Sequence, residues 1–189
     1  AWAIVFARAG REVALFDVEA SRTQQALGRV AVNVRELAGY DLIDDADASL
    51  ARITVANSLE DALDSAAYAQ ESVFERVETK AEFYTKISQV AGDDVVIGSS
   101  SSGIPASVFT EGLDCASRCL IAHPINPPYI IPLVEVVPTP WTSNATVQYC
   151  WQLMEETGMA PVRLNREVDG FVANRLQAAL LWEAFRLLE

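Results

Sequence analysis

Short apolar runs that alternate with amphipathic stretches are the feature that most constrains the fold of this chain. Val95 to Gly98 is apolar at every position, as expected for a strand of a parallel sheet that is covered on both faces. Other short runs predict strands at residues 13–16, 53–55, 66–73, 118–122, 134–137 and 161–164, and helical periodicity predicts helices at 21–37, 78–90 and 144–157. Alternation of strands and helices at this spacing predicts an α/β fold.

Composition limits the class of protein. With 189 residues, of which 51% are hydrophobic, the chain can bury a sizeable core as one domain, or as one domain and a fragment. The net charge of −12 argues against nucleic acid or an anionic membrane as a partner. No apolar run approaches the length of a membrane span and no signal peptide precedes the first strand, so we expect a cytoplasmic protein.

The cysteines predict neither a disulfide framework nor a metal site. They are three in number, Cys115, Cys119 and Cys150, and no pair has the C-x-x-C spacing of a zinc ligand set. We expect buried free thiols in a reducing compartment and no bound metal.

The first residues resemble the later part of a dinucleotide-binding βαβ unit. Ala1 to Ala9 has the pattern of a helix, with Gly10 where a C-cap glycine stands, and the strand that follows ends at Asp17. The first strand and the G-x-G-x-x-G turn of such a unit would need roughly 15–20 residues before Ala1. We therefore expect either that the chain is a fragment that lacks them or that its ends were not seen.

The stretch LIAHPINPPYIIPLVE carries the candidate chemistry. A short buried strand leads to His123, the only histidine, and the next apolar run carries one charge, Glu135. A buried carboxylate needs a partner, and a glutamate that accepts from one imidazole nitrogen leaves the other free as a base. The residues alone leave open a core histidine in a proline-stiffened loop and a glutamate on a solvated strand face.

The sheet pattern stops at residues 167–170, which is the one credible domain boundary. We expect a first domain over residues 1–168 and a single long helix from Phe171 to Glu189. Its apolar side, widened by Trp182 and Phe185, is broader than one contact with a sheet domain can cover. Such a helix needs more protein beside it, either the rest of a C-terminal domain or a second subunit.

Three motifs together carry a resemblance to a known family. The stretch HPINPPYIIPLVE, preceded by the serine run Ser99 to Ser102 and followed by GFVANRLQ from Gly170, resembles the 3-hydroxyacyl-CoA dehydrogenase family, and within it the L-gulonate 3-dehydrogenase or lambda-crystallin branch. The resemblance implies a Rossmann-type, doubly wound, mostly parallel sheet that binds NAD in residues 1–168. It also implies that residues 169–189 open an all-α C-terminal domain, most of which is missing here, that carries substrate and dimer contacts.

The resemblance also implies roles for individual residues. His123 would be the catalytic base and Glu135 the carboxylate that orients it, with Ser102 and Asn174 beside the substrate. Asp17 would bind the adenosine ribose, which favours NAD over NADP because a 2′-phosphate would meet like charge. The further cofactor contacts would be Glu75, Lys80, Ser102 and Asn126. Without the resemblance, we would assign Glu75 to a solvated loop, Lys80 to an exposed helix face and Ser102 to an ordinary polar turn.

The implied activity is NAD-dependent oxidation of the 3-hydroxyl of a small hydroxy acid, with L-gulonate oxidised to 3-dehydro-L-gulonate. The alternatives are a 3-hydroxyacyl-CoA or carnitine as the substrate, or a non-catalytic, crystallin-like protein. The intact His123, Asn126 and Glu135 favour an enzyme, and an acidic chain with no evident cationic cluster for CoA phosphates favours a small polyol acid. We expect a homodimer.

Overall fold

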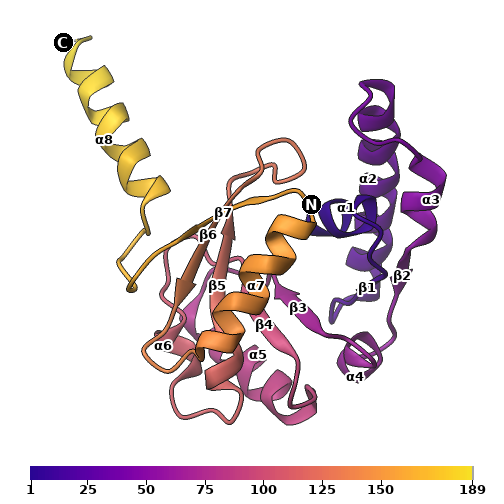
Figure 1. Ribbon diagram of the computed structural model, residues 1–189, viewed down its shortest axis with the longest axis horizontal. Coiled ribbons are helices and arrows are strands. Elements are labelled where there is room, and N and C mark those ends of the chain that lie inside the picture. The colour runs from indigo at the N-terminus through magenta and orange to yellow at the C-terminus, as the bar shows by residue number, and fades with distance from the viewer. Residues whose placement is uncertain (189) are drawn as a thin grey trace.

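The computed structural model describes residues 1–188 and has the expected α/β architecture (Figure 1). The helices are α1 (Trp2–Arg8), α2 (Ala20–Gly39), α3 (Ala46–Ala51), α4 (Leu59–Leu63), α5 (Val77–Val90), α6 (Ser107–Thr110), α7 (Asn144–Glu156) and α8 (Ala173–Arg186). The strands are β1 (Val13–Leu15), β2 (Ile53–Val55), β3 (Tyr68–Glu71), β4 (Val96–Ser99), β5 (Cys119–Pro124), β6 (Leu133–Pro138) and β7 (Ala160–Arg163). Every strand predicted from the sequence is present, with its ends moved by a few residues.

The strands are mostly parallel, as predicted, but they fall into two sheets. β1 pairs with β2 in parallel. β3 to β7 form a five-stranded sheet in chain order, in which the β5–β6 pairing is antiparallel and the other pairings are parallel. β1 and β3 are therefore both edge strands.

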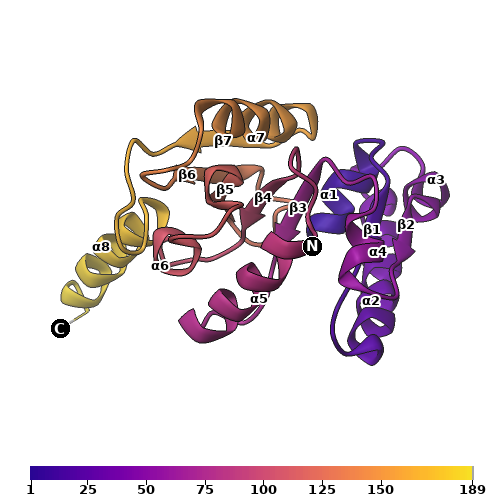
Figure 2. The ribbon, with the colours of Figure 1, turned by 90° about the horizontal axis from the view of Figure 1, so that it is seen from below.

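Side-chain alternation along β5 and β6 divides the core into two layers. Leu120 and Ala122 face one side, where they pack with Val134, Val136 and the buried face of α7. Cys119 and Ile121 face the other side, with Val137 and residues of α5 and α6. Figure 2 shows α7 on one face of the sheet and α5 and α6 on the other. His123 and Glu135 each lie two residues from a member of the second layer, so the period of two places them on the α5–α6 face.

α1 connects the two sheets. Trp2, Val5 and Phe6 join the core under α7, whereas Ala3 and Ile4 pack in a third cluster with residues of α2 and β2. The helix ends as predicted, with Gly10 in the left-handed region at φ 83°. A glycine adopts this conformation without the steric cost that a Cβ would add.

The inward face of α5 differs from the predicted one. The helical period over residues 78–90 favours Phe83, Ile87 and Val90 as the inward residues, but Phe83 and Val90 are only half-buried. The buried residues are Lys80, Tyr84 and Ile87, which are spaced i, i+4, i+7 along one helix face. Phe83 and Val90 pack against the same core as partly buried residues, so the inward face is wider than predicted and includes a lysine that the pattern assigned to solvent.

The C-terminal helix begins later than predicted. α8 starts at Ala173, because Gly170 and Phe171 both have positive φ values, 71° and 50°. Phe171, which was expected to be the first residue of the long helix, is instead fully buried in the core. From Ala173 onward α8 projects away from the sheet (Figure 1), and it has no buried residue. The predicted apolar surface is present, with Trp182 70% exposed; Glu189 lies outside the described residues.

Candidate active site

The carboxyl ends of the parallel strands bring the candidate polar residues to one edge of the fold. Asp17 follows β1, Glu71 ends β3, Ser99 ends β4 and His123 is the penultimate residue of β5. In open α/β sheets, ligands bind in the crevice at this edge. The alternation of strands and helices along the chain therefore brings these side chains to the same end of the sheet.

His123 and Glu135 form a buried hydrogen-bonded pair. They are directly opposite in the antiparallel register of β5 and β6, and Nδ1 of His123 lies 2.8 Å from Oε2 of Glu135. Both side chains are nearly inaccessible to solvent, at 6% and 2% exposed. An ionised carboxylate can only accept, so the imidazole donates from Nδ1–H and the neutral ring keeps its Nε2 lone pair free. The predicted contact is confirmed, and the alternative of a solvated Glu135 is excluded.

Glu75 organises the serine loop that follows β4. Its Oε1 accepts from the Ser101 hydroxyl at 2.7 Å and from the backbone N–H groups of Ser102 and Gly103 at 2.9 and 3.1 Å. Partial burial acts to raise the pKa of Glu75, but the Ser101 hydroxyl, Lys80 and these N–H groups outweigh it, so its pKa is lowered. Glu75 therefore positions Ser102, which lies exposed at the strand edge.

Lys80 lies under this loop, not on an exposed helix face. Its side chain is 1% exposed, and Nζ lies 2.9 and 3.0 Å from the two carboxylate oxygens of Glu71. The same carboxylate accepts from the Ser99 hydroxyl at 2.5 Å and the Val73 N–H at 2.6 Å. Nζ also lies 3.5 Å from Oε2 of Glu75, so Lys80 joins the buried Glu71 to the carboxylate that holds the serine loop.

The remaining predicted residues lie around the same edge. The side-chain amide of Asn174, in the first turn of α8, donates to the Ser102 carbonyl at 2.6 Å. Asn126 is exposed in the loop after β5, three residues beyond His123. Asp17 accepts from the Glu19 N–H at 2.9 Å in the turn that precedes α2. Sequence reasoning missed Glu71, Ser101 and Phe171, whose ring centroid lies 5.5 Å from that of His123.

The loops after β1 and β3 lie side by side and expose apolar side chains. The guanidinium of Arg22, in the first turn of α2, lies 5.3 Å from the ring centroid of Phe74. Val18, next to Asp17, is 84% exposed and Phe74 is 65% exposed. A small cavity of about 200 Å³ is lined by Phe74, Arg76 and Thr79. Val18 is therefore exposed next to Asp17 in the chain, and Phe74 is exposed at the cavity.

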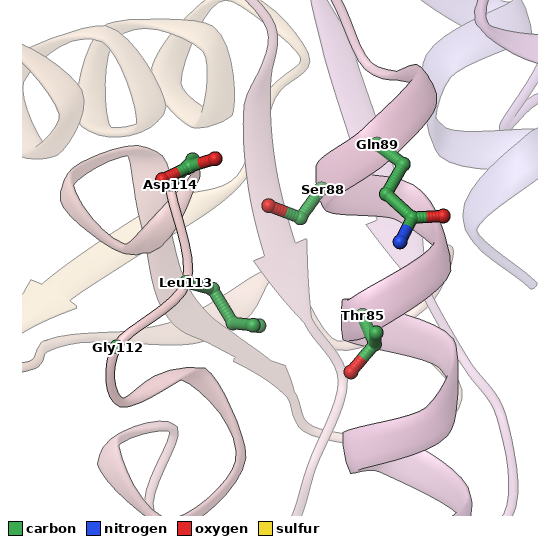
Figure 3. A pocket seen from close by; sticks show the side chains of 6 residues that line it. All are labelled: Thr85, Ser88, Gln89, Gly112, Leu113 and Asp114. Carbon is green, nitrogen blue, oxygen red and sulfur yellow. The ribbon is translucent and has the colours of Figure 1, made fainter.

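A cavity of about 400 Å³ lies elsewhere, between α5 and the loop that precedes β5 (Figure 3). Its lining includes Thr85 and Ser88 from the second half of α5, and Leu113 and Asp114 from the loop. It is at the amino-terminal end of β5, whereas His123 is near the carboxyl end. It is therefore not part of the His123 site.

Comparison with known proteins identifies the family. Residues 1–168 match the model of the 3-hydroxyacyl-CoA dehydrogenase, NAD binding domain. The chain belongs to this family. The bovine (Bos taurus) lambda-crystallin homolog is 43% identical over 191 residues, which cover 100% of this chain and 60% of that protein. An L-carnitine dehydrogenase/betainyl-CoA thioesterase from Rhizobium sp is 37% identical, covering 100% of this chain and 38% of that protein.

A solved structure shares the fold of this dehydrogenase-family chain. The (S)-3-hydroxybutyryl-CoA dehydrogenase from Ralstonia eutropha superposes with a TM-score of 0.91 at 26% identity, covering 99% of this chain and 66% of that one. The family, the Rossmann-type fold and the expected NAD-binding domain are thus confirmed. The chain spans about 60% of the length of the lambda-crystallin relatives that it matches.

Further expectations from composition can be compared with residues 1–188. All three cysteines are free and buried, as predicted. Over this range, no cluster of histidine, cysteine or carboxylate side chains has the geometry of a metal site. None of the helices in the described range is both long and apolar enough to cross a membrane.

Proposed function

We propose that the protein oxidises the 3-hydroxyl of a small hydroxy acid, with NAD as the oxidant, and that L-gulonate is the substrate. The observation that carries the proposal is the buried His123–Glu135 pair at the edge where sheets of this kind bind ligands. The pair supplies a base with a fixed tautomer, which proton removal from a secondary alcohol requires.

The residues of the chain fit NAD at the edge where it would bind. Asp17 would offer a carboxylate for the ribose hydroxyls, next in the chain to the exposed Val18. No G-x-G-x-x-G turn occurs within the 189 residues, so the chain as given offers no such cradle for the pyrophosphate. Bound NAD would supply the hydride acceptor for the reaction.

The proton is handled by the chain itself. Nε2 of His123 takes the proton of the substrate hydroxyl, and Glu135 balances the imidazolium through the Nδ1–H bond. Ser102 and Asn126 would hydrogen-bond the reacting oxygen and the neighbouring nicotinamide, and Asn174 joins α8 to the serine loop. Lys80 acts through Glu75, because its ammonium group is buried between carboxylates.

Substrate choice rests on similarity and charge. The resemblance to the L-gulonate 3-dehydrogenase or lambda-crystallin branch, whose lambda-crystallin members are 36–43% identical to this chain, supports a small polyol acid. The net charge of −12 supports it too, because it disfavours the phosphates of CoA. L-Carnitine is the second candidate, because relatives named L-carnitine dehydrogenase are 37–40% identical to this chain.

A substrate panel on the whole protein tests the proposal. NADH absorbance is followed with L-gulonate, L-carnitine and a short 3-hydroxyacyl-CoA, with His123→Gln as the matched control in each assay. L-Gulonate should give the highest kcat/KM, and the variant should lose the rate. A higher kcat/KM with either of the other two would replace L-gulonate as the substrate. Absence of NADH formation with all three would refute the dehydrogenase and favour a non-catalytic protein.

A further inference from the structure

The segment between the sheet domain and α8 has an unusual backbone. Gly170 and Phe171 are consecutive residues with positive φ values of 71° and 50°. Phenylalanine rarely adopts this conformation, and strained residues of this kind persist only where the surroundings impose them. Backbone N–H groups that follow such a turn can converge on an anion.

The anion in this structure is the Glu135 carboxylate. Its Oε1 accepts from the backbone N–H groups of Val172 and Ala173 at 2.8 and 2.9 Å, while its Oε2 binds Nδ1 of His123. Phe171 is fully buried, with its ring against the imidazole. The turn therefore contacts both members of the proposed base pair.

These contacts fix the orientation of the carboxylate. A glutamate held at one oxygen can rotate about its terminal bond, and that rotation would carry Oε2 away from the imidazole. Two N–H donors on Oε1 oppose the rotation, and they also satisfy an oxygen that is out of reach of water. Asn174, one residue further on, binds the Ser102 carbonyl at 2.6 Å. The start of α8 thus contacts the base pair and the serine loop.

We infer that the Gly170–Ala173 turn is a positioning element for the base, which couples the seating of α8 to the tautomer and orientation of His123. The inference rests on the proposed function for its effect on rate. Its structural part, the state of His123, does not depend on which substrate the protein uses.

Ala173→Pro tests the coupling at the first position of α8. Ala173 is the first residue of α8, a position where proline is tolerated because its N–H is not used inside the helix. The substitution removes one of the two donors to Oε1. Arg175→Pro, in the same first turn, is the matched control, because it leaves both bonds to Glu135 in place.

The direct readout is the tautomer of His123, the only histidine of these 189 residues. The ¹⁵N signals of its ring, assigned in the whole protein with His123→Gln, report which nitrogen carries the proton. In the wild type and in Arg175→Pro we expect the Nδ1–H form alone. In Ala173→Pro we expect a mixture of the two tautomers, and a kcat lower by roughly 10- to 100-fold, since small displacements of a catalytic group have effects of that size.

Two results would overturn the inference: a single Nδ1–H tautomer in Ala173→Pro, or an equal change in both proline variants. If Ala173→Pro does not fold, Gly170→Ala replaces it, because a Cβ there meets its nearest atoms at 3.9 Å and acts only through the positive φ. If the wild type has no activity but Ala173→Pro still changes the tautomer of His123, the proposed function is refuted and the positioning role remains supported.

Discussion

Replacing Lys80 with methionine should destabilise the protein by several kcal/mol. The substitution keeps the length and apolar stem of the side chain but removes the ammonium group from the buried Glu71 carboxylate. Glu71 would keep only the Ser99 hydroxyl and the Val73 N–H as partners. Breaking a buried ion pair at one partner costs about 3–5 kcal/mol, because the other charge stays buried.

Urea unfolding, followed by tryptophan fluorescence, measures this loss. With a denaturant slope of about 2 kcal/mol/M, the midpoint of Lys80→Met should fall by about 1.5–2.5 M. Lys86→Met is the matched control: it lies on the same helix but is exposed, so its free energy of unfolding should change by about 0.5 kcal/mol or less.

The double variant Lys80→Met/Glu71→Leu separates the charge from packing. Removing both charges should recover most of the lost stability, because well-packed apolar residues often replace a buried pair at no net cost. If Lys80→Met lost no more than Lys86→Met, the ammonium group would not be buried against Glu71. If the double variant were no more stable than Lys80→Met, the loss would come from packing and not from the unpaired charge.

Three further predictions follow from the same structure. Asp17→Ala should narrow the preference for NAD over NADP in kcat/KM. Asp93→Ala, an equal charge change at the other end of the sheet, should leave that preference unchanged. Equal kcat/KM with both cofactors in the wild type would contradict the ribose role of Asp17. The pKa of Glu75 is lowered on folding, so its contribution to stability should be complete above the unfolded value of about 4.5 and be lost as the pH falls through the lower folded value. The acid-induced drop in the free energy of unfolding should therefore be smaller in Glu75→Gln than in the wild type. An equal drop in the two proteins would refute this contribution. Because Leu176, Leu180, Trp182 and Phe185 of α8 are exposed, the 189-residue chain should associate in light scattering, and a stable monomer with Trp182 in water would contradict this.

Several features of the site were predictable because each has a local physical cause. A lone glutamate inside PLVEVV needs a partner when buried, and the only histidine stands at the end of the preceding apolar run. The two-residue period of the strands then places both side chains on one face. The role of Asp17 stays a prediction, because its position at a strand end says where it lies and not what it binds.

Other features depended on packing that the sequence shows less directly. Lys80 shares one helix face with Tyr84 and Ile87, and this spacing was a signal that its side chain is buried. A lysine is rarely buried without a carboxylate partner, however, and Glu71 had not been recognised as that partner. Phe171 was assigned to the C-terminal helix because the composition of residues 171–189 fits a helix. Only the positive φ of Gly170 and Phe171 shows that the chain turns there to place the ring against His123.

The most direct test of the account is His123→Gln in the whole protein, with turnover and NAD binding measured separately. Because the base acts on the substrate hydroxyl and does not hold the adenosine half, kcat should fall by roughly 10²–10⁴-fold while the Kd for NAD changes by no more than about twofold. A variant that keeps its turnover, or that loses NAD binding instead, would show that His123 is not the base.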